Sequence, residues 1–405
     1  MEILENKSIS CVKGFRVASI HAGFKRNEKL DMGLIVSDVP AVSAAVFTTN
    51  LVKAAPVQLD MKHIKNDTTR ALIINAGNAN ACTGQQGLDD ARSESERVAK
   101  ALGVKPEEVL VYSTGVIGQP LPMDKVNAGI DKCLDSLRDD GDELYKAIMT
   151  TDTREKRIYL RMQLSGKDVD ICGIAKGSGM IHPNMGTMLS YVVTDCNITK
   201  EMLTRIQKDV TAGTFNMVTV DGDTSTNDTA TIVANGLAGN TLIDRTDTKD
   251  YECFCEAVYY VTEYLAKAIA ADGEGASRFM EVYVYGADEL EQARTLARSV
   301  AGSSLFKAAL HGADANWGRI VCAMGYSGAR FDQNKVDVGF ESKAGEIEVF
   351  TKGVPLQFDE DLATKILSED RVQVKINLNS GEAQAKAWGC DLTAEYVKIN
   401  GDYRS

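Results

Sequence analysis

The segment KGSGMIHPNMGTMLSYVVTD, from Lys176 to Asp195, places turn-forming residues directly before a predicted β-strand. Its first half contains glycines, a proline and an asparagine, which favour tight turns. Its second half, LSYVVTD, is rich in the β-branched and aromatic residues that favour strands. Gly186 and Thr187 stand where the two halves meet. This junction is either an ordinary turn that enters a buried strand or a site with chemistry of its own.

A threonine at such a junction can become a nucleophile if the chain is cut in front of it. A threonine hydroxyl is weak and needs a base, and a free α-amine on the same residue, with a pKa near 8, would supply one. The cut would require the Thr187 hydroxyl to attack the preceding carbonyl. Glycine at position 186 tolerates the strained backbone that this attack needs and leaves the carbonyl uncrowded. On the residues alone, the turn and the nucleophile both remain open.

Other segments carry the same strand signals. The predicted strands cover residues 44–50, 70–77, 109–115, 157–164, 169–177, 280–286, 371–378 and 382–390. We expect one hairpin around Ser165-Gly166-Lys167 and a second around Asn379-Ser380-Gly381.

Two segments carry a helical spacing of apolar residues, 255–270 and 288–300. Asp288 is predicted to cap the second helix, with Glu291 three residues on, and Gly302 is predicted to end it. Hairpin-like strands with inserted helices, without strict βαβ alternation, predict an α+β or layered α/β protein.

Composition and charge exclude several classes of protein. A chain of 405 residues has ample material for a buried core and suggests about two domains. The net charge of −12 disfavours nucleic acid and anionic membranes as partners, since both need concentrated Lys and Arg. The N-terminus does not resemble a signal peptide, and no apolar run reaches the ~18 residues of a membrane span. Nine scattered cysteines, an odd number, are typical of a reducing compartment, so we expect a cytoplasmic protein.

Motifs for metal, nucleotide and triad chemistry are missing. The four histidines form no close ligand pair, so we expect no metal site. No phosphate-binding loop and no GxSxG elbow is present. The segment DGDTSTN, from Asp221, imitates the oxygen spacing of a calcium loop but lacks its glycine and final glutamate. It is predicted to be a polar turn.

The wider sequence resembles a known family. KGSGMIHPNMGTML closely resembles the processing and active-site segment of the ornithine acetyltransferases, also called glutamate N-acetyltransferases. The resemblance extends over nearly the whole chain, in the family's order, through AAVFTTNLVKAAPV (44–57), INAGNANACTG (74–84), STGVIG (113–118), TTDT (150–153), DGDTSTND (221–228), ADGEGASR (271–278), DANWGRI (314–320), WGCDLT (388–393) and YVKINGDYRS (396–405).

The resemblance implies a precursor that cuts itself between Gly186 and Thr187. The two products, 1–186 and 187–405, would stay in one intertwined layered α/β fold with sheets between helices, usually as an α2β2 assembly. Thr187 would then be nucleophile and general base, and Thr114 with Gly115 would form the oxyanion hole. The implied reaction is ping-pong transfer of an acetyl group from N2-acetylornithine to glutamate, in arginine biosynthesis. It demands no cofactor, and acetyl-CoA remains open as an additional acetyl donor.

Substrate contacts also follow from the resemblance. A bound amino acid presents a carboxylate and a charged side-chain amine, and Lys176 and Glu274 suit those two groups. The family pattern assigns further contacts to the positions matching Thr153, Thr187, Asn400 and Ser405.

Two residues depart from the commonest family pattern. Gly186 replaces an alanine, and His182 replaces a small residue. His182 is interpreted as a histidine on the solvent side of a loop, with contact to the substrate channel as the alternative. Two other functions remain open. The chain could be an N-terminal-nucleophile amidohydrolase or aminopeptidase, which passes the acyl group to water. It could also be a non-catalytic binding or scaffold protein with an intact Gly186-Thr187 bond.

Overall fold

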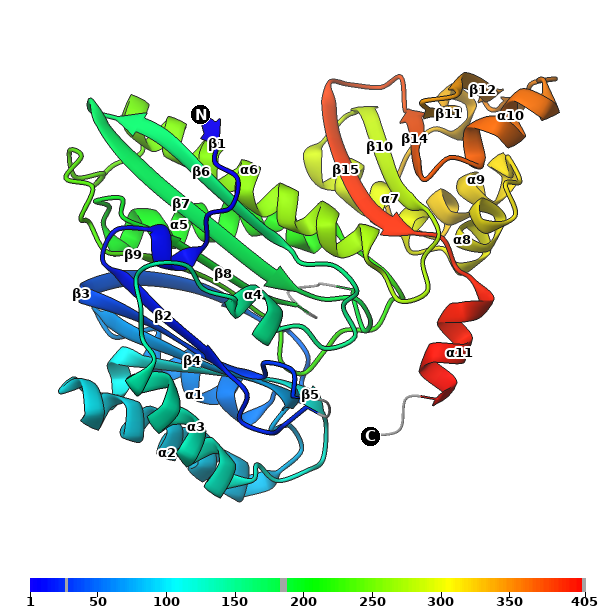
Figure 1. Ribbon diagram of the computed structural model, residues 1–405. Helices are drawn as coiled ribbons and strands as arrows, with labels where there is room; N and C mark the ends of the chain where they lie inside the picture. The colour runs from blue at the N-terminus through cyan, green and yellow to red at the C-terminus, as the bar shows by residue number, and fades with distance from the viewer. Residues whose placement is uncertain (26–27, 183–187, 403–405) are drawn as a thin grey trace.

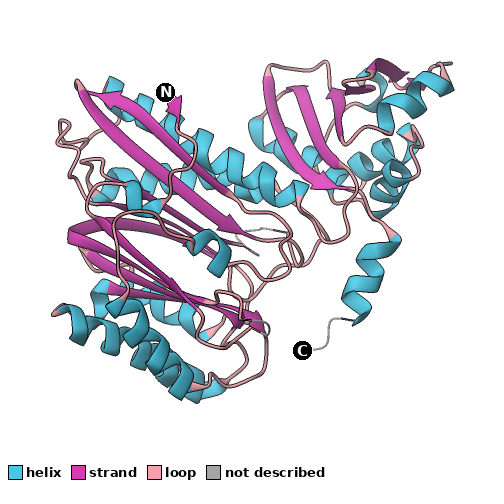
Figure 2. Ribbon diagram, viewed as in Figure 1, coloured by secondary structure: helices cyan, strands magenta, loops and turns pink. Residues whose placement is uncertain are grey.

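Four layers make up the larger part of the molecule, in the order helices, sheet, sheet, helices (Figures 1 and 2). The structure is a computed structural model, and it describes residues 1–25, 28–182 and 188–402. A smaller unit with its own sheet follows the four layers along the chain (Figure 1). The predicted layered α/β class is confirmed. Within the described residues, no helix has both the length and the apolar character that a membrane crossing would need.

Within the described residues, nine strands are linked by hydrogen bonds in the order β1-β6-β7-β8-β9-β3-β4-β5, with β2 beside β3. Their bounds are β1 Glu2–Ile3, β2 Phe15–Ile20, β3 Met32–Phe47, β4 Thr69–Asn78, β5 Val109–Val116, β6 Arg157–Leu164, β7 Lys167–Lys176, β8 Leu189–Thr194 and β9 Thr229–Ala234.

Strand β3 joins the two inner layers because its halves have different neighbours. Residues 32–36 pair with β2 and β4, and residues 42–47 pair with β9. The pairing with β4 is irregular between Val36 and Ala41, where β3 passes from one layer to the other. One continuous ladder therefore supplies both sheets of the sandwich.

Apolar residues on both faces of the strands hold the layers together. Between the sheets, Val17, Leu72 and Tyr112 pack with Ile174 and Tyr191. Outward-facing residues of the β6–β9 layer pack under α5 (Lys200–Gly213) and α6 (Lys249–Ala271). Those of the β2–β5 layer pack under α1 (Ala55–His63), α2 (Gly84–Leu102) and α3 (Met123–Asp135). Burial on both faces explains why the LSYVVT of β8 is apolar or small at nearly every position.

The smaller unit has a second sheet in the order β13-β12-β11-β14-β10-β15. Its strands are β10 Phe279–Ala287, β11 Asp337–Ser342, β12 Gly345–Thr351, β13 Val354–Pro355, β14 Arg371–Asn377 and β15 Ala383–Cys390. The remaining helices are α4 Leu144–Ala147, α7 Leu290–Ala301, α8 Ser304–His311, α9 Trp317–Gly325, α10 Glu360–Leu367 and α11 Ala394–Asp402, with 3-10 turns at Ile9–Cys11, Pro106–Glu108, Phe215–Met217 and Gln333–Lys335.

The hairpin expected around Asn379-Ser380-Gly381 is wrong. Strands β14 and β15 are not neighbours, because β10 lies between them, parallel to β14 and antiparallel to β15. The turn instead crosses the end of β10, where the amides of Ser380 and Gly381 both donate to the carbonyl of Gly286. The hairpin around Ser165 and Gly166 is confirmed, with Leu164 facing Lys167.

The predicted cap of α7 is also wrong. The helix begins at Leu290 with Glu289 at the N-cap, and within the described residues no side chain caps it. The backbone amide of Asp288 donates to the Gln292 side chain, so Asp288 lies outside the helix. Gly302 ends the helix as predicted.

Candidate active site

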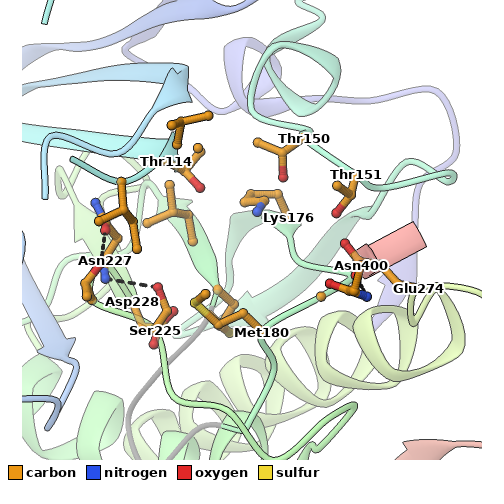
Figure 3. A pocket seen from close by; sticks show the side chains of 17 residues that line it. Thr114, Thr150, Thr151, Lys176, Met180, Ser225, Asn227, Asp228, Glu274 and Asn400 are labelled. Carbon is orange, nitrogen blue, oxygen red and sulfur yellow. Dashed lines mark hydrogen bonds between the residues drawn. The ribbon is translucent and has the colours of Figure 1, made fainter. Parts of the chain in front are cut away.

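A cavity of about 460 Å³ opens where the ends of β5 and β7 meet the starts of β8 and β9 (Figure 3). It brings together five of the residues predicted for the site, Thr114, Gly115, Lys176, Glu274 and Asn400. These come from positions spread over most of the chain. The cavity size lies in the range that suits a small-molecule ligand.

The end of β5 carries the Thr114–Gly115 pair in a conformation that only glycine tolerates at the second position. Gly115 has φ +133°, and a Cβ there would lie 2.3 Å from the backbone carbon of Gly77. Asn227 fixes this strand end, since its amide nitrogen donates to the carbonyls of Ser113 and Ala79 at 2.8 and 2.7 Å. These contacts tie the end of β5 to the segment that leads into β9.

Lys176, the last residue of β7, brings a buried cation to the cavity (Figure 3). Its side chain is nearly inaccessible to solvent. Burial lowers the pKa of its ammonium, while the charge of Asp152 opposes that effect. A buried ammonium of this kind attracts a carboxylate strongly, because little water screens the charge.

An ion cluster behind Lys176 fixes the segments that line the cavity. The Lys156 ammonium, buried between two aspartates, donates to Asp152 at 2.7 Å and to Asp272 at 2.5 Å. Asp152 also accepts from the amides of Thr150 and Gly177. Burial opposes ionisation of Asp152, but Lys176 and Lys156 together lower its pKa to about 2.

Thr153 belongs to this cluster and does not line the cavity. Its hydroxyl and its backbone amide both donate to the Asp272 carboxylate. The preceding residues Thr150 and Thr151 line the cavity in its place. The TTDT motif therefore presents its first two threonines to the cavity and its fourth residue to the ion cluster.

Glu274 and Asn400 lie together at one side of the cavity (Figure 3). The Asn400 amide, on α11, donates to the Glu274 carboxylate at 2.9 Å. The Glu274 backbone amide donates to the carbonyl of Ser178. Gly179 has no side chain because a Cβ there would lie 2.3 Å from the Glu274 carboxylate. Glu274 thus adds an acidic group to the cavity that Lys176 also lines.

The segment DGDTSTND is more than the polar turn that we predicted. Ser225, Thr226, Asn227 and Asp228 all line the cavity, and the last three are buried. Only the polar composition in front of the apolar strand β9 could have indicated this, and solvent-exposed turns share that composition.

Three predicted site residues, Gly186, Thr187 and Ser405, lie outside the described residues. Met188, which follows Thr187 in the chain, lines the cavity. His182 is half-buried rather than on the solvent side: its ring lies 3.0 Å from the Thr219 hydroxyl and 3.4 Å from the Arg298 guanidinium. Burial, aided by Arg298, lowers the pKa of His182. In the described part of the chain, no group of His, Cys, Asp and Glu side chains could hold a metal ion.

Comparisons with known proteins agree on one family. The model of the ArgJ family matches residues 16–405. A relative from Clostridium acetobutylicum, named arginine biosynthesis bifunctional protein ArgJ 1, is 52% identical over 100% of this chain and 99% of its own.

Two solved structures are also similar. The crystal structure of arginine biosynthesis bifunctional protein argJ from Bacillus halodurans is 45% identical, with a TM-score of 0.51, and covers 54% of this chain and 100% of its own. The crystal structure of an ornithine acetyltransferase complexed with ornithine, from Mycobacterium tuberculosis, is 39% identical over 45% of this chain and 98% of its own, with a TM-score of 0.42. With the family model and a full-length relative in agreement, the chain belongs to the ArgJ family.

Proposed function

We propose that the protein transfers the acetyl group of N2-acetylornithine to glutamate through an ester on Thr187. Its membership of the ArgJ family makes it an acyltransferase of arginine biosynthesis. The observation that carries the finer proposal is one cavity, bordered by Met188, that holds Thr114 and Gly115 with a buried cation and an acidic group. Those are the groups that acyl transfer between two amino acids requires.

In the first half of the reaction, the Thr187 hydroxyl oxygen attacks the acetyl carbonyl carbon. The Thr187 α-amine takes the hydroxyl proton and passes it to the leaving nitrogen, so the C–N bond breaks and ornithine departs. The oxyanion accepts hydrogen bonds from the Thr114 hydroxyl and the Gly115 amide. The hydrogen bond that fixes the end of β5 and the conformation that Gly115 adopts there support this role.

In the second half, the glutamate amine attacks the ester and restores the free threonine. Both amino acids use one cavity of about 460 Å³, which supports a ping-pong order with one bound at a time. Lys176 would bind the α-carboxylate that the two share. Glu274, with Asn400, would bind the side-chain amine of ornithine.

Self-cleavage between Gly186 and Thr187 would release the α-amine that the mechanism uses. The product 187–405 would contain about 54% of the chain. The solved Bacillus halodurans chain aligns over its whole length with 54% of this chain, the same share that 187–405 would make up. This agreement supports a product of two chains. Assembly as α2β2 in the cytoplasm, and a second activity with acetyl-CoA, are further parts of the proposal.

Thr187→Ala tests the proposal directly. We expect the purified variant to give one band on denaturing electrophoresis and no acetylglutamate. Wild type should give two bands, with an N-terminal threonine on the larger product. Thr187→Ser keeps the hydroxyl and should restore cleavage.

Brief exposure of wild type to acetylornithine should add one acetyl group to the fragment that begins at Thr187. A single intact wild-type band would contradict the nucleophile. Predominant release of acetate instead of acetylglutamate would make the protein a hydrolase. Adding acetyl-CoA with glutamate decides whether the second activity exists.

A further inference from the structure

Asp228 is a buried carboxyl in the cavity wall whose second oxygen has no partner among the described residues. It immediately precedes β9, is almost inaccessible to solvent and lines the same cavity as Lys176 (Figure 3). Within the described residues, its Oδ2 is buried and forms no hydrogen bond. A buried polar atom without a partner is costly, so such an atom in a cavity wall indicates a ligand group.

The protein fixes this carboxyl in place. It accepts hydrogen bonds from the backbone amides of Met188 and Ser225 and from the Ser225 hydroxyl. Met188 leads into β8, and Thr229, the next residue after Asp228, pairs with Leu189 of that strand. The carboxyl is thus held between the starts of two hydrogen-bonded strands, in a residue that lines the cavity.

Burial and the neighbouring charges act in opposite directions on the Asp228 carboxyl, and burial dominates. Burial raises the pKa of this carboxyl well above its usual range, whereas the Lys176 ammonium, the two backbone amides and the Ser225 hydroxyl act to lower it. Lys176 in turn is flanked by Asp152, Lys156 and Glu274. The raised pKa makes Asp228 easier to protonate than an exposed aspartate.

The reaction in "Proposed function" needs a group that stores one proton between its halves. The Thr187 hydroxyl proton makes the leaving ornithine nitrogen a neutral amine, which needs one more proton to become an ammonium. Glutamate arrives as an ammonium, because α-amino groups have pKa values near 8 or above, and must lose one proton before it attacks. The ornithine amine gains one proton in the first half of the reaction, and the glutamate ammonium loses one proton in the second half.

We propose that Asp228 exchanges this proton with the amino nitrogen of the amino acid in the cavity. The protonated carboxyl donates to the departing ornithine amine and becomes a carboxylate. The carboxylate then takes the proton from the glutamate ammonium, which frees the nitrogen lone pair to attack the ester. This role rests on the proposed function, and it adds Asp228 to the groups that touch the substrate.

Asp228→Asn and Glu94→Gln form a matched pair for the test. Glu94, on α2, is also a fully buried carboxyl without hydrogen-bond partners in the described structure, but it does not line the cavity. We expect Asp228→Asn to lower kcat by about 10²- to 10⁴-fold, to change KM much less, and to remove one limb of the pH–rate profile. Glu94→Gln should keep the wild-type kcat and profile. A wild-type profile in Asp228→Asn, at any kcat, would overturn the proposal.

A binding measurement keeps the test independent of chain cleavage. Ornithine is titrated into Thr187→Ala by calorimetry in buffers of different ionisation enthalpy. The ornithine ammonium should displace the Asp228 proton, so binding near pH 7 should release up to about one proton. Thr187→Ala/Asp228→Asn should release none. If ornithine binds Thr187→Ala without releasing a proton, the role of Asp228 is overturned. Failure of the proposed function gives a different result, because the wild-type protein would then make no acetylglutamate.

Discussion

Glu94 shows how much one buried carboxyl can change the pH dependence of stability. It lies within the packing of α2, and neither carboxylate oxygen has a hydrogen-bond partner in the described structure. Burial, and then the charge of Asp90, raises the pKa of Glu94 to about 8. The unfolded chain, with a pKa near 4.5 at this position, releases the proton first as pH rises. The stability that protonated Glu94 contributes below pH 4.5 is therefore lost progressively as the pH rises toward 8.

Glu94→Gln should remove this loss, because glutamine does not ionise. The free energy of unfolding of the variant, relative to wild type, should rise between pH 5 and pH 8 by about 3–5 kcal/mol. Urea unfolding at several pH values measures it. Glu96→Gln changes an exposed residue of the same helix and should leave the wild-type pH dependence intact. Parallel curves for wild type and Glu94→Gln would refute the prediction.

Sequence patterns identify site residues by type but not by burial. Lys176 and Glu274 were predicted because a resemblance marked them among many other charged residues. Asp228 and Lys156 were missed, since a solvated aspartate or lysine has the same letter as a buried one. Their burial depends on β8, β9 and the 271–276 turn meeting in space, which no local pattern encodes. Thr153 shows the converse. It was predicted to contact the substrate, but its backbone amide donates a hydrogen bond to Asp272.

At the scale of elements, the ion cluster around Lys156 joins three segments that share no secondary structure. It links the 150–154 loop, the end of β7 and the turn after α6 through Asp152 and Asp272. The Asp272 carbonyl also accepts from the Ser178 hydroxyl, and Ser178 in turn accepts from the Glu274 amide. The separation of Lys176 and Glu274 therefore depends on this cluster.

Lys156→Met should leave two buried carboxylates without their shared cation. We expect the free energy of unfolding to fall by about 3–5 kcal/mol, as happens when one partner of a buried ion pair is removed. KM for acetylornithine should rise as Lys176 and Glu274 lose their fixed spacing. Urea unfolding and steady-state kinetics test both effects. Lys146→Met removes an exposed lysine paired with Glu143 and should change neither. A Lys156→Met variant with the stability and KM of wild type would show that the ion cluster does not fix Lys176 and Glu274.

Local pairing was predictable wherever neighbouring strands are also consecutive in the chain. Ser165 and Gly166, both at positive φ, form the tight turn that joins β6 to β7. Asn379-Ser380-Gly381 has equally good turn residues, yet β10 separates the strands it connects. The turn sequence specifies a reversal of the chain. It does not specify which strand lies alongside, because that depends on contacts with a segment almost 100 residues away.

At the scale of the whole molecule, the proposed cut falls within one sheet and not between two domains. Strands β8 and β9 follow the cut, but they lie between β7 and β3, which precede it. Hydrogen bonds join β7 to β8 and β3 to β9. The core between the sheets likewise mixes Tyr191 and Val233 with Val17 and Tyr112. Separation of the two products would break two strand ladders and open this core.

We therefore expect cleavage to leave the fold intact. In native buffer, the products 1–186 and 187–405 should elute together in size-exclusion chromatography, at the volume of uncleaved Thr187→Ala. They should also unfold in a single urea transition, because neither product has a complete larger sheet or inter-sheet core of its own. Mass spectrometry of the eluted peak identifies both products. Elution of 1–186 by itself, or separate unfolding of the two products, would show that the interleaved strands do not hold them together.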